Sequence, residues 1–136
     1  MALVLDTGPV ISALDRSERD HGSCRSLIKQ TNEVLIIPAP VLVEICYWIE
    51  TRMRGGALGV FLRDIAYQIE DLRAEDYERA RQICDRYTDT PVGFVDAAVL
   101  AVVERLNEPK LATLDRRRFS LMRPRHVAAL RLLPSE

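Results

Sequence analysis

Short apolar runs alternate with longer amphipathic segments along this chain, and that alternation limits the folds it can adopt. β-Branched and apolar runs predict strands at 3–5, 34–37 and 110–114, with weaker candidates at 67–72 and 130–133. Between them, apolar residues recur at three- and four-residue spacing, as in helices that cover a sheet. Such helices are expected at 10–14, 20–31, 41–53 and 94–106, around Leu58, Phe61 and Ile65, and along Tyr77, Ala80, Cys84 and Tyr87. Short strands joined by helices indicate parallel βαβ units, so we predict a single three-layer α/β/α domain over residues 1–136 with a central parallel sheet.

Composition narrows the function classes. The chain has 136 residues, enough for one compact core without disulfides, and its formal net charge of -1 means that any nucleic-acid contact must come from a local basic patch. Cys24, Cys46 and Cys84 lie far apart without zinc-ligand spacing, which favours buried thiols and a reducing cytoplasm. No apolar run approaches the length of a membrane span, and the run before Asp6 is too short for a signal peptide.

Four carboxylates occupy places where a purely structural protein rarely puts them. Asp96 is the only polar residue in 94–103, and Glu44 is the only charged residue in 41–49, so both helices are expected to be buried on most sides. Asp6 and Asp115 each end a predicted strand, and ligand sites of parallel sheets lie beyond the carboxyl ends of the strands. Four converging acids repel one another, and a divalent metal ion would relieve that repulsion.

The type of ligand indicates the metal. Four carboxylates form an all-oxygen set, which suits Mg²⁺ or Mn²⁺. Such sites serve phosphoryl chemistry by activating a water and stabilising charge on the attacked phosphate, so phosphodiester hydrolysis is the predicted reaction. Arg116, Arg117 and Arg118 follow Asp115 and would line the rim of the site, where they either contact phosphates or form a solvated charge run.

Each acid also has a plainer interpretation. Asp6 and Asp115 could cap the helices that follow them, and Glu44 could pair with a buried arginine. Asp89, in the loop before the Asp96 helix, could serve the turn rather than a metal.

The segments that carry these acids resemble those of PIN-domain proteins, and most of all VapC-type toxins of bacterial toxin–antitoxin pairs. The matching strings are Val-Leu-Asp-Thr at 4–7, Glu44 in its apolar helix, Gly-Phe-Val-Asp-Ala at 93–97 and Ala-Thr-Leu-Asp-Arg-Arg-Arg-Phe at 112–119. The resemblance implies a PIN-like fold and an endoribonuclease that requires Mg²⁺ or Mn²⁺, held by Asp6, Glu44, Asp96 and Asp115. It also implies a homodimer and a cognate antitoxin whose tail covers the site.

One departure from the family concerns hydroxyl groups near the acids. Gly8 follows Thr7 where many relatives carry a hydroxyl residue, which leaves Thr7 and Ser12 as candidates. Each of Thr7 and Thr113 could orient Asp6 or Asp115; alternatively, Thr7 could simply cap the first helix and Thr113 could simply fill a strand.

Three other classes compete with a ribonuclease. A receiver-type signalling domain should carry adjacent acids after the first strand and a late lysine, whereas the last lysine here is Lys110. A phosphatase with an aspartyl nucleophile should carry a second Asp where this chain has Gly8. A catalytically inactive PIN domain acting as a scaffold would not need all four acids.

Overall fold

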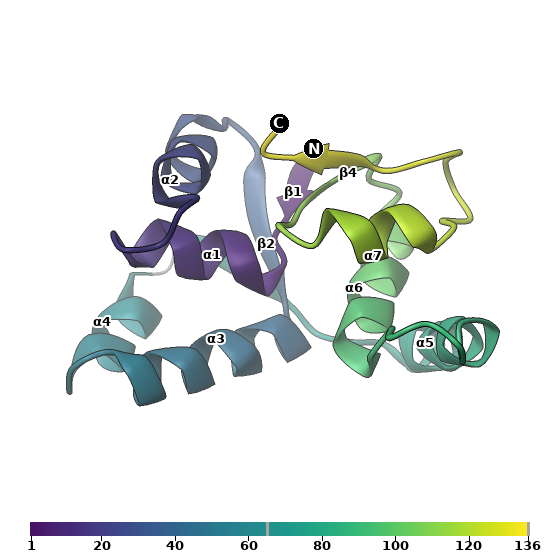
Figure 1. Cartoon of the computed structure of the whole chain (residues 1–136), viewed down its shortest axis with the longest axis horizontal. Coiled ribbons are helices and arrows are strands. Elements are labelled where there is room, and N and C mark those ends of the chain that lie inside the picture. Colours follow the sequence, from purple (N-terminus) through teal and green to yellow (C-terminus); the bar gives the residue numbers. More distant parts are fainter. Residues whose placement is uncertain (65, 136) are drawn as a thin grey trace.

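The sheet is parallel throughout the computed structural model, which describes residues 1–64 and 66–135 (Figure 1). Strands β1 (Ala2–Val4), β2 (Val34–Pro38) and β3 (Tyr67–Glu70) pair in that order, and β4 (Lys110–Ala112) pairs with β5 (Arg131–Leu133). A parallel bridge between Leu5 and Ala112 joins the two groups, so β1 lies between β2 and β4. The predicted central parallel sheet is confirmed.

Seven helices within the described residues connect these strands. The pair α1 (Thr7–Leu14) and α2 (His21–Gln30) leads to β2, and the pair α3 (Ala39–Arg52) and α4 (Ala57–Arg63) leads to β3. The pair α5 (Ala74–Arg86) and α6 (Phe94–Arg105) leads to β4, and α7 (Arg116–Leu121) precedes β5. Figure 1 shows α1 to α4 on one side of the strands and α5 to α7 on the other. Strands β2 and β3 are added on one side of β1, and β4 and β5 on the other. Because crossovers between parallel strands are right-handed, this change of direction puts the later helices on the opposite face of the sheet. None of the described helices is long and apolar enough to cross a membrane.

Helix α6 lies in the middle of the core. Every residue from Ala97 to Val103 is buried, alongside Leu3 and Ile37 of the strands. Burying each valine or leucine side chain of this stretch contributes about 1.5–3 kcal/mol to stability, so the helix is held firmly and the residues of its first turn have fixed positions. Asp96 belongs to that first turn.

Two expectations change in detail. Helix α1 begins at Thr7, three residues before the predicted start, because Pro9 fits the first turn, where its missing N–H costs no hydrogen bond. The helix expected around Leu58 and Phe61 is confirmed as α4, and the predicted position of Ile65 lies outside the described residues.

Helix α3 is less buried than its composition predicts. It buries Val41, Ile45 and Ile49, which recur every four residues and face the core, whereas Val43 and Tyr47 are 68% and 69% exposed. Glu44 lies on the exposed side as well. The expectation that this helix is buried on most sides is therefore wrong for the single chain, because only one of its faces packs into the core.

Candidate active site

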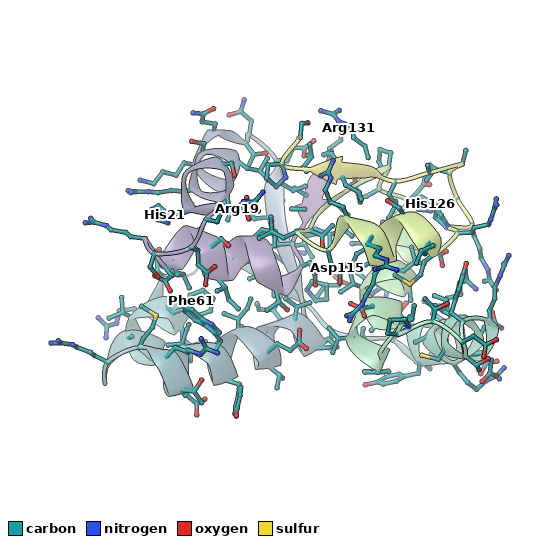
Figure 2. The ribbon with its side chains drawn as sticks, viewed as in Figure 1. Arg19, His21, Phe61, Asp115, His126 and Arg131 are labelled. Carbon is teal, nitrogen blue, oxygen red and sulfur yellow. The ribbon has the colours of Figure 1, made fainter. Side chains whose placement is uncertain are left out.

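Two acids meet where neighbouring strands β1 and β4 end. The backbone N–H of Asp6 donates to the carbonyl of Ala112 at 2.9 Å, which aligns the two chain segments. The hydroxyl of Thr113 donates to Oδ2 of Asp6 at 2.8 Å and accepts from the backbone N–H of Asp115 at 3.0 Å. The fully buried Thr113 therefore connects both acids, and Figure 2 shows Asp115 at the start of α7. The topology changes direction here, which is the place where parallel sheets bind ligands.

Asp6 is the most deeply buried acid of the group. It is only 8% exposed, and burial is the main reason that its pKa rises from the ordinary 3.8 to about 6. Hydrogen bonds from Thr113 and from the backbone of Thr7 lower this pKa, whereas the charges of Asp96 and Glu44 raise it further. Asp6 occupies the N-cap position of α1 but makes no capping hydrogen bond with its side chain, so the plain capping role is not realised.

Glu44 reaches the same place from α3. The hydroxyl of Thr7 donates to its Oε1 at 2.6 Å, and within the described residues Glu44 forms no ion pair, so the alternative of a buried arginine partner is not realised. The start of α1 also lies close to the end of β4, because a Cβ at Gly8 would stand 3.3 Å from the side chain of Leu114. In place of the hydroxyl that the family resemblance leads one to expect at position 8, Gly8 packs tightly against Leu114, and the hydroxyl of the preceding Thr7 contacts Glu44.

Arg118 links the remaining two acids. Its Nη1 lies 3.2 Å from Oδ2 of Asp96, and its Nε lies 3.3 Å from Oδ2 of Asp115. Asp115 also accepts the backbone N–H of Arg118 through Oδ1 at 3.1 Å, so it does cap α7. Asp96 in turn accepts the N–H of Gly93 at 3.3 Å. The capping interpretation of Asp115 is confirmed, and its Oδ2 contacts the guanidinium of Arg118.

The charge at this site is poorly balanced. Buried acids elsewhere have close cations: Asp76 lies 3.0 Å from Arg105, and Glu104 lies 2.7 Å from Arg79. The four candidate acids share one guanidinium, that of Arg118, among the described residues. No group of three or more acidic, histidine or cysteine side chains in 1–64 and 66–135 is already arranged to hold a metal ion. The chemistry of the donors nevertheless fits a hard divalent cation, because the donors are all carboxylate oxygens and their charge is largely uncompensated.

Other predicted site residues lie away from the acids or have different contacts. Ser12 is buried in α1, where its carbonyl oxygen lies 2.7 Å from Nδ1 of His21, and Asp89 is exposed in the turn after α5. The guanidinium of Arg116 donates to the carbonyls of Leu132 and Pro134 at 3.3 and 2.9 Å, which secures the C-terminal segment. Their roles at the site stay predictions, as does that of the exposed Arg117.

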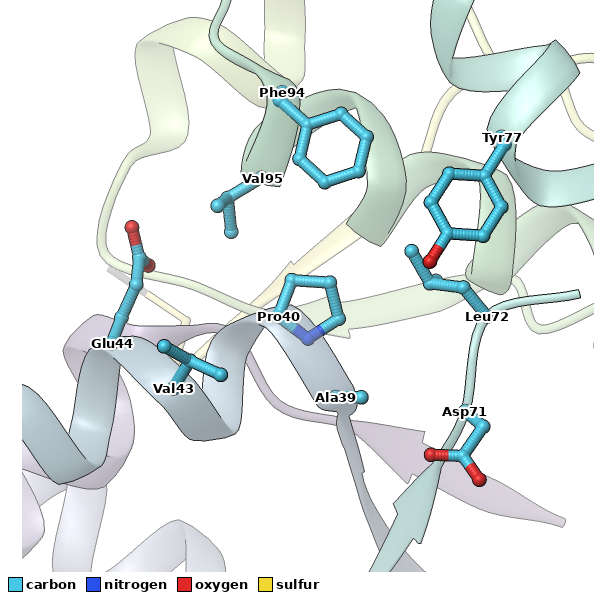
Figure 3. Close-up of a pocket in the computed structure, with 9 residues that line it drawn as sticks. All are labelled: Ala39, Pro40, Val43, Glu44, Asp71, Leu72, Tyr77, Phe94 and Val95. Carbon is cyan, nitrogen blue, oxygen red and sulfur yellow. The ribbon is translucent and has the colours of Figure 1, made fainter.

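An aromatic groove beside Glu44 was not predicted. The rings of Tyr77 and Phe94 stack with centroids 6.2 Å apart, and both line a groove that also includes Val43 and Glu44 (Figure 3). The available sequence signal was Phe94, an aromatic residue two positions before Asp96. Phe94 is 47% exposed, whereas the same helix is buried from Ala97 to Val103.

Comparison with known proteins identifies the family of the chain. Residues 3–123 match the family model of the PIN domain. The chain is 30% identical over 125 residues to Ribonuclease VapC26 of Mycobacterium tuberculosis, a match that covers 90% of this chain and 93% of that protein.

Solved structures extend the comparison to the fold. The structure is similar to that of Mycobacterium tuberculosis VapC20, described as a sarcin–ricin loop cleaving toxin, with a TM-score of 0.74 and 19% identity over 93% of this chain and 98% of that one. It is also similar to VapBC2 from Rickettsia felis bound to a promoter DNA fragment, with a TM-score of 0.73 and 16% identity over 97% and 98% of the two chains. At these identities the likeness establishes the fold, whereas the family model and the 30% identical relative establish the family. The chain belongs to the PIN-domain family, among its VapC-type members.

Proposed function

We propose that this chain is the toxin of a toxin–antitoxin pair and that it hydrolyses RNA phosphodiester bonds as a metal-dependent endoribonuclease. The observation that carries the proposal is the group of four carboxylates at the carboxyl ends of β1 and β4, with a single guanidinium among them. The relationship to Ribonuclease VapC26 over nearly the whole chain supports the same reaction.

The proposed cofactor is Mg²⁺ or Mn²⁺. PIN-domain VapC ribonucleases are generally metal-dependent. Asp6, Glu44, Asp96 and Asp115 would supply the oxygen ligands, and the hydroxyls of Thr7 and Thr113 would hold two of those carboxylates in place. A bound divalent ion would supply activation of the attacking water and neutralisation of charge at the phosphate.

The hydroxyl contacts also restrict how the acids move. Thr113 holds Asp6 through Oδ2, and Thr7 holds Glu44 through Oε1, so each carboxylate keeps its other oxygen for a ligand. Side chains that are fixed in this way lose little freedom on binding, which strengthens binding without any additional contact.

The proposed partners follow from the relatives. VapC20 is described as cleaving the sarcin–ricin loop, so ribosomal RNA is the first substrate to test. Solved neighbours that are toxin–antitoxin complexes, such as one from Klebsiella pneumoniae, support a cognate antitoxin. A homodimer and a cytoplasmic location remain part of the proposal, and the exposed Val43 and Tyr47 are available for contact with a second copy.

Cleavage of total cellular RNA by the purified chain tests the reaction. Wild type should give discrete fragments with Mg²⁺ or Mn²⁺ and none with EDTA, and Asp96→Asn should give none under any condition. Asp85→Asn is the matched control, because it makes the same chemical change on an exposed aspartate of α5 that is paired with Arg81. It should cleave like wild type.

Other outcomes would redirect the proposal. Fragments that persist in Asp96→Asn or with EDTA would refute the carboxylate–metal site. RNA binding without cleavage by wild type in either metal would favour an inactive scaffold. The receiver interpretation already fails on topology, because such domains place β1 between β2 and β3, whereas here it lies between β2 and β4.

A further inference from the structure

Arg118 occupies the space between two acids that the proposed metal would need. Its guanidinium faces Oδ2 of Asp96 at 3.2 Å and Oδ2 of Asp115 at 3.3 Å, and these acids come from different helices, α6 and α7. Among the described residues it is the one cation in contact with the four acids. A metal ion bound to these two oxygens would lie next to the guanidinium and be repelled by its charge, so the two cations compete for Asp96 and Asp115.

The arginine is held weakly enough to leave. Its side chain is 40% exposed, and the distances to both acids are longer than those of well-formed charge-assisted hydrogen bonds. Arg105 gives the contrast, since its side chain is 11% exposed and bonded to Asp76 and Glu70 at 3.0 and 2.9 Å. Arg105 is built as a permanent structural cation, whereas Arg118 can rotate into solvent at low cost.

We propose that Arg118 is the internal counter-cation of this site: it holds Asp96 and Asp115 together in the metal-free protein and is displaced when the metal binds. The inference rests on the proposed function. Arg118 is thus a positioning residue that competes with the metal, and it sets the metal concentration at which the site fills.

Direct measurement of Mn²⁺ binding tests this competition. Titration calorimetry on the purified full chain should show Arg118→Gln binding Mn²⁺ on the order of tenfold more tightly than wild type, because two partly screened ionic contacts no longer need to be broken. Arg117→Gln removes the same charge from the adjacent, exposed position and should change the affinity by less than about threefold, since screening weakens a charge without direct contact. Arg118→Lys keeps the charge but not the forked geometry and should fall between wild type and Arg118→Gln.

Thermal unfolding gives a readout that does not depend on cleavage. Without metal, Arg118→Gln should unfold at a lower temperature than Arg117→Gln, because the acids then repel one another without a counter-charge. Addition of Mn²⁺ should raise the unfolding temperature of Arg118→Gln by more than it raises the unfolding temperature of Arg117→Gln. Circular dichroism of each variant confirms that the fold is retained.

The results separate this inference from the proposed function. If wild type binds no Mn²⁺, or if Asp96→Asn binds it as wild type does, the proposed metal site itself fails. If wild type binds Mn²⁺ and Asp96→Asn does not, but Arg118→Gln binds equally well or more weakly, the metal site stands and the competition is refuted. Equal strengthening by Arg117→Gln would also refute it, because the effect would then be general electrostatics.

Discussion

Asp6 should destabilise the metal-free protein at neutral pH, and Asp6→Asn should reverse that effect. Burial raises the pKa of Asp6 from 3.8 to about 6, so the folded chain binds this proton more tightly than the unfolded chain does. Stability from this group is present below pH 3.8 and is lost as the pH rises to about 6. Each tenfold change in proton affinity corresponds to about 1.4 kcal/mol, which makes the total loss about 3 kcal/mol.

The asparagine variant isolates this loss, because its amide oxygen can still accept the hydrogen bond from Thr113 but carries no charge. Urea unfolding in EDTA should show Asp6→Asn gaining stability relative to wild type as the pH rises. Relative to its value well below pH 3.8, the difference in unfolding free energy should grow by about 1 kcal/mol at pH 4.5 and by about 3 kcal/mol at pH 7.5. Excess Mn²⁺ should shrink the difference by stabilising wild type alone. A difference that does not change with pH, or an asparagine variant less stable than wild type at pH 7.5, would refute the reasoning. Asp85→Asn, made on an exposed aspartate of α5, should show no such growth.

Three further substitutions test the surroundings of the acids. Thr113→Val should cost about 1–3 kcal/mol of unfolding free energy, because it removes the hydroxyl that donates to Asp6 and accepts from the part-buried N–H of Asp115, and Thr113→Ser should restore most of it in the same urea assay. Arg116→Gln should lower stability by about 1 kcal/mol and speed proteolysis of the C-terminal segment, whereas Arg117→Gln should change neither. Glu44→Gln should leave unfolding within about 0.5 kcal/mol of wild type, since the side chain is exposed, yet reduce RNA cleavage by about two orders of magnitude in a fluorescence assay.

The fold was largely predictable because its signals are local. The apolar run at β2 and the unbroken apolar stretch of α6 determine their own structure through burial, and both are confirmed. Helix α3 shows the limit of such reasoning, because all residues of 41–49 except Glu44 are apolar or aromatic, yet only Val41, Ile45 and Ile49 are buried. Composition reports how much apolar surface a helix has, but the number of neighbours that cover it depends on tertiary packing and assembly.

The sequence predicted that Asp6 and Asp115 lie close together, but it did not predict the contacts around them. Their proximity was predictable because each acid follows a predicted strand, and parallel strands end at one edge of the sheet. The contact between Arg118 and Asp96 joins residues 22 positions apart through the path of a loop, and no periodicity encodes that path. Arg116 is the opposite case. The sequence predicted that it lines the site together with Arg117 and Arg118, whereas its guanidinium bonds to the carbonyls of Leu132 and Pro134.

The cost of the acid group argues for its function independently of any relative. A chain selected for stability alone would gain by replacing Asp6, since its buried charge is opposed by burial and by two neighbouring acids. The same chain compensates its other buried acids with close arginines, as Asp76 and Arg105 show, so the means to balance charge are present in this fold. The imbalance at Asp6, Glu44, Asp96 and Asp115 is therefore best explained by a cation that the chain does not itself provide, and the stability lost in its absence is the quantity that the Asp6→Asn experiment measures.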